Sequence, residues 1–354
     1  MRRTFVALYA IICTLLLVAG CLAVFFLAWE SSVNDAVKAL VGLLFGFILA
    51  PILHEIGHFV FAKANDMRCV YLKCFCFRFI SENGRKRFSF VSPFQADETQ
   101  VIPKSGGNMK KRAQRYAVGG LVFSAIFLSI VVTLSVLMTV FIRPNYLLWG
   151  LVPYFAYLLI LNLPALEYAS GKTDGLVYKG IRRGYDAEKV MVSAMEIQGQ
   201  LYEGKRFSEI DKRYYFDLPQ LCEDEPAYAV ILDLRYRYFL DKDDMEGAAD
   251  SLNRLAWLQS YLTSAEIEKV AGELTYMHAV SGDLDDAEAS GQLCKTFLKG
   301  ETATAKRILL AYVKASQKTD AVDALLSQAK TALEKEPIKG VAEFERRLIS
   351  KLTD

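Results

Sequence analysis

The stretch that decides the fold is ALVGLLFGFILAPILHEIGHFVFA, residues 39–62. It is long enough to cross a bilayer as a helix, which takes about 20 apolar residues. Within it, His54, Glu55 and His58 form an HExxH sequence, and ionisable side chains at membrane depth are energetically costly and rarely accidental. Helical residues four apart share a face, so both imidazoles can bind one Zn²⁺ while Glu55 reaches a metal-bound water. The stretch therefore predicts a hydrolase that works within a membrane.

The composition divides the chain into two halves of different character. Of 354 residues, 53% are hydrophobic, and the net charge of +2 averages a very apolar first half and a charged second half. The chain contains 3 His, of which only His278 lies outside the HExxH sequence. A third metal ligand is therefore expected to be a carboxylate. No DNA-binding motif is present, so we expect no nucleic-acid partner.

The length of the apolar stretches predicts about four transmembrane helices, at residues 5–29, 39–62, 116–142 and 146–166. The first follows Arg2 and Arg3 and contains a lipoprotein-like cleavage sequence ending at Cys21. Because the apolar run continues past Cys21 with no polar sequence, we interpret it as a membrane anchor rather than a signal peptide. The predicted fold class is an all-α polytopic membrane protein with a cytosolic β-hairpin insert and a C-terminal helical repeat domain.

The orientation follows from the distribution of Lys and Arg. The loop at residues 63–115 is rich in both, whereas loops 30–38 and 143–145 carry one basic residue each. Because basic loops stay in the cytosol, both termini and the HExxH end of the second span are predicted to be cytosolic. We expect a multi-pass integral protein and favour a bacterial plasma membrane.

The third-ligand candidate follows the fourth apolar stretch. Asn162 and Pro164 can end that helix near the cytosolic surface, and Asp174-Gly175 is predicted to lie in the following turn. The fourth span runs in the same direction as the second, so its end lies at the depth of the His pair. Asp174 could then reach back to the metal, and Glu167 is a reserve candidate.

With these features the chain resembles the site-2 protease family of intramembrane zinc metalloproteases, over residues 36–180. The resemblance rests on the HExxH sequence in an apolar helix, on the glycine-containing stretch 118–124 and on the Asn-and-Pro segment that ends in Asp174-Gly175. The family usually places Asp-Gly close behind the Pro, whereas ten positions separate Pro164 from Asp174 here. From the residues alone, Gly119 and Gly120 indicate close helix packing.

The resemblance implies one zinc ion, held by His54, His58 and Asp174, with Glu55 as the catalytic acid/base and Asn162 near the substrate. The expected activity is that of an intramembrane zinc metalloendopeptidase. It would hydrolyse a peptide bond in or near a transmembrane segment of a membrane protein or precursor peptide held in the lipid bilayer.

A hairpin is predicted within residues 68–92. Residues 70–80 alternate as a strand with Phe75, Phe77 and Phe79 on one face, Asn83-Gly84 is a turn signal, and residues 87–91 resume the alternation. The edge of this hairpin could hold an unwound substrate by strand addition, with Phe75 and Phe77 as contacts. The family resemblance implies such a membrane-associated hairpin. The alternative is a surface hairpin with aromatic anchors and no substrate role.

Residues 181–354 are predicted to form a cytosolic helical domain, after an anchor at residues 1–35 and the protease core at 36–180. Polar breaks at 203–207, 242–246 and 281–285 stand about 39 residues apart, and a fourth at 317–320 follows after about 36. Ala248, Ala287 and Ala321 follow them as positions of close helix approach. The pattern resembles a tetratricopeptide-type array, which could bind a cytosolic protein, or a helical domain that only packs on itself.

Two other functions remain open. A catalytically silent relative would act as a membrane-anchored adaptor through its helical repeats. A metal transporter would need further ionisable residues along a pathway, and within the four spans only Glu55 and its two neighbouring His are present.

Overall fold

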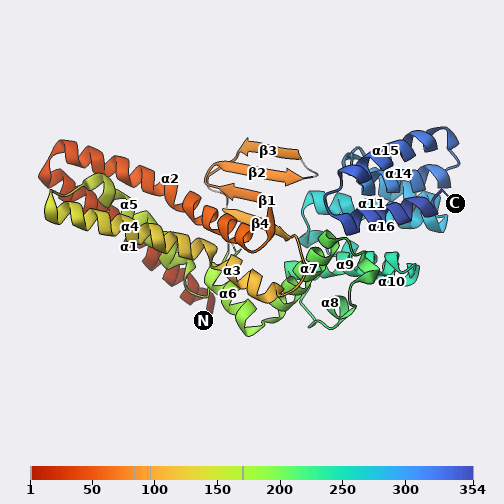
Figure 1. Ribbon diagram of the computed structural model, residues 1–354, viewed down its shortest axis with the longest axis horizontal. Helices are drawn as coiled ribbons and strands as arrows, with labels where there is room; N and C mark the ends of the chain where they lie inside the picture. Colours follow the sequence, from red (N-terminus) through yellow and green to blue (C-terminus); the bar gives the residue numbers. More distant parts are fainter. Residues whose placement is uncertain (1, 83–84, 94, 96, 170, 354) are drawn as a thin grey trace. The chain divides into compact units, whose positions relative to one another are not determined.

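A computed structural model describes residues 2–82, 85–93, 95, 97–169 and 171–353. Most of the described chain is helical, and a small antiparallel sheet is inserted in it (Figure 1), so the predicted fold class is confirmed in this coarse form. The chain divides into two compact units, the first made of Met1–Ser81, Lys86–Ile102 and Lys110–Gly184, the second of Glu82–Arg85, Pro103–Met109 and Tyr185–Asp354.

Four apolar helices of the first unit pack side by side: α1 (Arg2–Ser31), α2 (Val33–Ala64), α4 (Gly119–Phe141) and α5 (Tyr146–Asn162) (Figure 1). Three helical segments are long and apolar enough to cross a membrane, namely Thr4–Ser31, Val33–Ala64 and Met109–Phe141. The fourth expected span corresponds to α5, which is apolar but shorter. Its crossing of the membrane stays a prediction.

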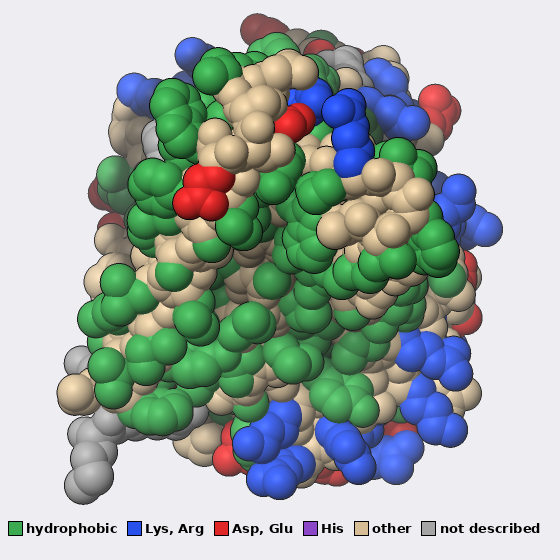
Figure 2. Space-filling view, turned by 90° about the vertical axis from the view of Figure 1, so that its left-hand side faces the viewer, with side chains coloured by type: hydrophobic (Ala, Val, Ile, Leu, Met, Phe, Trp, Pro, Cys, Tyr) green, Lys and Arg blue, Asp and Glu red, His purple; other side chains and the backbone are tan. Residues whose placement is uncertain are grey.

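The outer surfaces of these helices are apolar. Large hydrophobic side chains such as Leu15, Leu44 and Phe141 are 62%, 60% and 76% exposed. Hydrophobic side chains also cover much of the face shown in Figure 2. Exposed apolar surface on this scale is unusual for a protein in water and is typical of contact with lipid.

Helices α2 and α4 are in close backbone contact at the HExxH sequence. A Cβ at Gly57, between the two histidines, would lie 2.4 Å from the carbonyl oxygen of Gly119, so a larger residue has no room. Small residues permit such backbone contact between membrane helices. The contact places the start of α4 directly against His54 and His58.

The sheet contains β1 (Met67–Cys74), β2 (Phe77–Glu82), β3 (Arg85–Phe90) and β4 (Glu98–Pro103), in the order β3-β2-β1-β4. The prediction of one strand over residues 70–80 was wrong, because the chain reverses at Phe75-Cys76 and Cys74 pairs with Phe77. Phe75 has φ 53°, a left-handed conformation that costs a non-glycine residue about 1–2 kcal/mol. No turn-forming residue marks this position. The predicted Asn83-Gly84 turn lies outside the described residues.

The third-ligand segment also differs from the prediction. After α5, a short hairpin of β5 (Glu167–Tyr168) and β6 (Gly171–Lys172) leads into α6 (Asp174–Arg183). Asp174 and Gly175 therefore begin a helix instead of lying in a turn. Thr173 caps it by accepting a hydrogen bond from the Leu176 N–H.

Between the sheet and α4 lies the short basic helix α3 (Met109–Ala117).

The second unit is an array of helices around its own hydrophobic core. Its helices are α7 (Asp186–Glu203), α8 (Arg213–Phe216), α9 (Pro226–Asp241), α10 (Met245–Trp257), α11 (Ser264–Ser281), α12 (Leu284–Leu293), α13 (Lys295–Leu298), α14 (Ala303–Ala315), α15 (Val322–Lys335) and α16 (Lys339–Lys351).

The predicted breaks fall at or between the ends of these helices. Each contains a left-handed residue, namely Gly204, Asp243, Gly282 and Gln317. Ala248 and Ala287 are fully buried at helix contacts, as predicted, whereas Ala321 is exposed because it lies in a short 3₁₀ turn before α15. The tetratricopeptide-like character of the array stays a prediction.

Candidate metal centre

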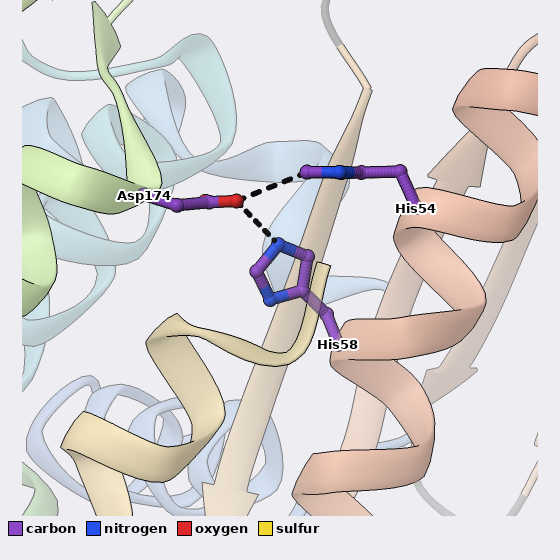
Figure 3. A group of neighbouring side chains, drawn as sticks. All are labelled: His54, His58 and Asp174. Carbon is purple, nitrogen blue, oxygen red and sulfur yellow. Dashed lines mark ion pairs between the residues drawn. The ribbon is translucent and has the colours of Figure 1, made fainter. Parts of the chain in front are cut away.

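Two helices bring His54, His58 and Asp174 to one point (Figure 3). The histidines project from successive turns of α2, and Asp174 is the first residue of α6. Its Oδ2 atom lies 3.0 Å from Nε2 of His54 and 3.2 Å from Nε2 of His58. Both histidines are buried. The geometry therefore presents two imidazole nitrogens and one carboxylate oxygen within reach of a single ion.

The Nδ1 atoms of the two imidazole rings also lie at hydrogen-bond distance from neighbouring groups. Nδ1 of His54 lies 3.0 Å from the Ser124 hydroxyl of α4, and Nδ1 of His58 lies 3.1 Å from the Tyr116 carbonyl oxygen. A carbonyl only accepts hydrogen bonds, so Nδ1 of His58 must carry a proton, and a neutral ring then presents the Nε2 lone pair. Metal-binding histidines are usually oriented in this way.

The Asp174 oxygen at the centre of the cluster supports a metal. Within the described part of the chain, Oδ2 is buried and has no hydrogen-bond partner. It faces the Nε2 atoms of His54 and His58, and a cation placed between these three atoms would interact favourably with the carboxylate oxygen and with the lone pair of each neutral ring. Two neutral imidazoles and one carboxylate are a donor set that Zn²⁺ takes in catalytic sites, with a fourth position left for water or substrate.

Gly120 leaves the space that such an ion needs. A Cβ added at this position in α4 would lie 2.5 Å from Nε2 of both His54 and His58. Any side chain there would occupy the point on which the ligand atoms converge. The expected role of Gly119 in helix packing agrees with its contact with Gly57, whereas Gly120 faces the ligands themselves.

Glu55 is buried beside the cluster. Its Oε2 accepts a 2.5 Å hydrogen bond from the Thr99 hydroxyl of β4. The Thr99 carbonyl in turn accepts a hydrogen bond from the Tyr116 hydroxyl, and the Tyr116 carbonyl is the partner of His58. The sheet and α3 thus connect the carboxylate of Glu55 with one of the candidate ligands.

The roles of Ser124, Tyr116 and Thr99 were not predicted from the sequence. Ser124 could have been placed near the site from the sequence, because it lies four residues after Gly120 and hence on the same face of α4. Thr99 could not have been identified in this way, since its contact with Glu55 depends on the sheet pairing that places β4 beside α2.

A cavity of about 390 Å³ adjoins the cluster. It is lined by His54, Glu55, Asp174 and Asn162, together with Pro51, Gln95, Asp97, Leu158, Leu161, Tyr168, Gly171, Lys172 and Thr173. Asn162 thus lines the cavity, and its Nδ2 donates to the Leu158 carbonyl one turn back in α5, while its expected contact with the substrate stays a prediction. Burial raises the pKa of Asp97 above its ordinary value, although the adjacent Lys73 opposes that rise.

The other expected site residues lie elsewhere. Phe75 does not line the cavity but packs edge-on against Phe47 of α2, with ring centroids 5.5 Å apart. Phe77 stacks on Phe88 within the sheet, at 5.9 Å. Glu167, the reserve ligand, is exposed in β5 and outside the cluster. The two phenylalanines were expected on one strand face, but the turn at Phe75 separates them.

No protein-family model, no curated protein and no solved structure matches this chain. A functional assignment therefore has to come from the residues of the site and their surroundings.

Proposed function

We propose that this protein is an intramembrane zinc metalloendopeptidase, similar to the site-2 proteases, that hydrolyses a peptide bond in or near a transmembrane segment of a membrane-bound substrate. The observation that carries the proposal is the buried Asp174 oxygen, 3.0 and 3.2 Å from the two HExxH imidazole nitrogens, beside a buried glutamate. In this interpretation His54, His58 and Asp174 hold one zinc ion.

A bound Zn²⁺ would polarise the scissile carbonyl and lower the pKa of a coordinated water to about 7. Glu55 takes a proton from the attacking water and passes it to the leaving amine. Thr99 holds one oxygen of Glu55, which restricts the rotation of the carboxylate during both transfers. Ser124 orients the His54 ring, and the Tyr116 carbonyl keeps His58 in the orientation and tautomer that metal binding requires.

The substrate must be unwound before it can react, because a helix hides its carbonyl groups in internal hydrogen bonds. Strand addition to the sheet is one way to hold an unwound segment. The sheet order leaves β3 and β4 as edges, and β4 carries Thr99 beside the site. At Thr99 itself the carbonyl already accepts a hydrogen bond from Tyr116, so pairing on β4 would have to use its other residues.

The three candidate spans support an integral membrane location. We infer in addition that α5 crosses the membrane, that both termini are cytosolic and that the catalytic end faces the cytosol. The helices of the second unit would then offer a cytosolic surface to a substrate or a regulatory protein, as tetratricopeptide arrays do.

The decisive experiment compares the membrane proteomes of cells that carry the native protein or Glu55→Gln. Single-span proteins should accumulate uncut in the variant, and reconstituted protein should cut single-span test helices about 10²–10⁴-fold more slowly after the substitution. Zinc content should be unchanged in Glu55→Gln and lost in His54→Ala. Identical proteomes, with no test helix cut by the native protein, would contradict the protease proposal.

The same experiment tests the second candidate, a silent adaptor. An adaptor would lose its function on changes to the second unit and not on Glu55→Gln. The intact set of ligands, base and adjoining cavity favours the enzyme.

A further inference from the structure

Lys73 and Asp97 form an ion pair that the proposed chemistry does not use. Lys73, in β1, is 1% exposed, and its Nζ lies 2.7 Å from Asp97 Oδ1. Nζ also donates to the Gln95 carbonyl. A lysine is almost never buried unless it is paired. The pair therefore holds the segment that precedes β4 firmly against β1.

The same carboxylate oxygen stabilises the turn at Phe75. The Phe75 N–H donates to Asp97 Oδ1 at 2.8 Å, and Phe75 has the left-handed φ of 53°. Strained residues of this kind persist where the surrounding structure holds them, and they occur often at ligand-binding sites. Oδ1 of Asp97 thus has two donors, one from Lys73 and one from the Phe75 backbone.

The second oxygen of Asp97 has no donor among the described residues. Asp97 is 24% exposed in its side chain and lines the cavity that also contains His54, Glu55 and Asp174. Because Lys73 and the Phe75 N–H both donate to Oδ1, they set the orientation of the carboxylate, and Oδ2 is the oxygen left for a further partner.

An unwound substrate supplies the matching donor. Unwinding a helix frees backbone N–H groups, and a free N–H away from water costs several kcal/mol if it finds no acceptor. The carbonyls of the segment face a metal site, whereas its N–H groups need oxygen acceptors. A carboxylate is among the strongest acceptors that a protein can offer.

We propose that Asp97 is a substrate-binding residue whose Oδ2 accepts a hydrogen bond from a backbone N–H in the unwound segment of the substrate helix. This role rests on the proposed protease function. Lys73 is a positioning residue that acts through Asp97, and the two together select an unwound segment over an intact helix, whose N–H groups beyond the first turn are bonded internally.

The test combines Asp97→Asn with substrates in which one backbone amide at a time is replaced by an ester, which removes a single N–H. Asp66→Asn is the matched control, since it is the same chemical change at an acid of the first unit whose side chain is 57% exposed and does not line the cavity. We expect Asp97→Asn to lower kcat/KM about tenfold, mainly through KM, with zinc content unchanged, and Asp66→Asn to have no effect.

The ester series separates substrate binding from a structural role. One ester close to the scissile bond should lower the cleavage rate of the native protein about tenfold but that of Asp97→Asn less than twofold. This difference would show an energetic coupling between the replaced N–H and Asp97. If Asp97→Asn loses metal or fails to fold, the double variant Lys73→Met/Asp97→Asn takes its place in the ester series. The double variant removes both charges of the pair, so neither is left buried without a partner.

The outcomes distinguish the two proposals. Cleavage with identical ester profiles in the native and variant proteins would overturn the role of Asp97 and leave the protease function standing. If the native protein cuts no test helix and Glu55→Gln binds none, both proposals fail.

Discussion

A Cβ at Gly120 would lie 2.5 Å from Nε2 of His54, so α4 can pass beside the candidate ligands only with glycine at this position. The same added atom would lie 2.5 Å from Nε2 of His58. The geometry of the candidate metal centre therefore depends on the absence of a side chain at Gly120 as well as on His54, His58 and Asp174.

Gly120→Ala should abolish metal binding because its methyl group occupies the point where the ligand atoms converge. We expect zinc content, measured by atomic absorption on purified protein, to fall at least tenfold and cleavage to fall with it. Gly20→Ala is the control, since a Cβ there would meet Pro153 only at an ordinary 3.6 Å. Full zinc content in Gly120→Ala would mean that the ion is held elsewhere.

Ser124→Ala should weaken the metal site without removing a ligand. Ser124 Oγ lies 3.0 Å from Nδ1 of His54, and loss of such a partner typically lowers metal affinity 10–100-fold. Competition with a zinc chelator measures this change. Ser135→Ala is matched, because Ser135 is also fully buried in α4 but bonds only to the Val131 carbonyl of its own helix. Equal affinities in the two variants would exclude the orienting role.

Thr99→Val should slow catalysis and leave zinc binding intact. The Thr99 hydroxyl donates to Glu55, and a hydrogen bond to a charged group contributes about 1.5–3 kcal/mol, which corresponds to a roughly 10–100-fold loss of rate. Thr99→Ser keeps the hydroxyl and should retain most of the activity. Turnover of a reconstituted test helix is the measurement, and equal rates for Val and Ser would show that Thr99 does not position Glu55.

Glu273→Gln should destabilise the second unit in a pH-dependent manner. Burial by itself would raise the pKa of Glu273, but Arg307 and Arg237 outweigh it and hold the pKa below its ordinary value. Arg307 lies 2.7 Å from the Glu273 carboxylate, and both side chains are buried. Removing one partner of a buried pair costs about 3–5 kcal/mol, or roughly 6–20 °C in Tm for a domain of this size.

The sign of the pH effect follows from the lowered pKa. The contribution of Glu273 to stability is fully present above its ordinary pKa of about 4.3 and is lost as the pH falls through the lower folded value. The difference in Tm between native protein and Glu273→Gln should therefore shrink from pH 7 to pH 3. Asp250→Asn breaks an exposed pair with Arg254 and should change Tm very little at any pH. A pH-independent difference for Glu273→Gln would contradict the ionic role.

The predicted orientation can be tested through Cys222, the exposed free cysteine of the second unit. A membrane-impermeant maleimide should label Cys222 only after the cells are permeabilised. Arg143→Cys, in the loop predicted to lie outside, should react in intact cells. The reverse pattern would invert the topology and place the metal centre at the outer surface.

Local patterns in the sequence predicted the elements well. Apolar length predicted four spans, of which three correspond to helices that are long and apolar enough to cross a membrane, and the polar breaks predicted where the helices of the second unit end. The proximity of His54 and His58 also followed from the sequence, because residues four apart share a helix face whatever surrounds them. The turn at Phe75 did not follow, since a distant carboxylate, Asp97, stabilises a conformation that no local residue favours.

The sequence by itself determined three candidate membrane spans, the paired imidazoles with Glu55 beside them, and the helical character of the second unit, because each depends on the spacing of neighbouring residues. Only the tertiary structure decided that Asp174 meets the imidazoles, that Ser124 and Thr99 hold His54 and Glu55, and that Gly120 leaves the site open. These contacts join segments far apart in the chain. Their positions follow from backbone contact between α2 and α4 and from the pairing of the sheet, which no periodicity within one segment encodes.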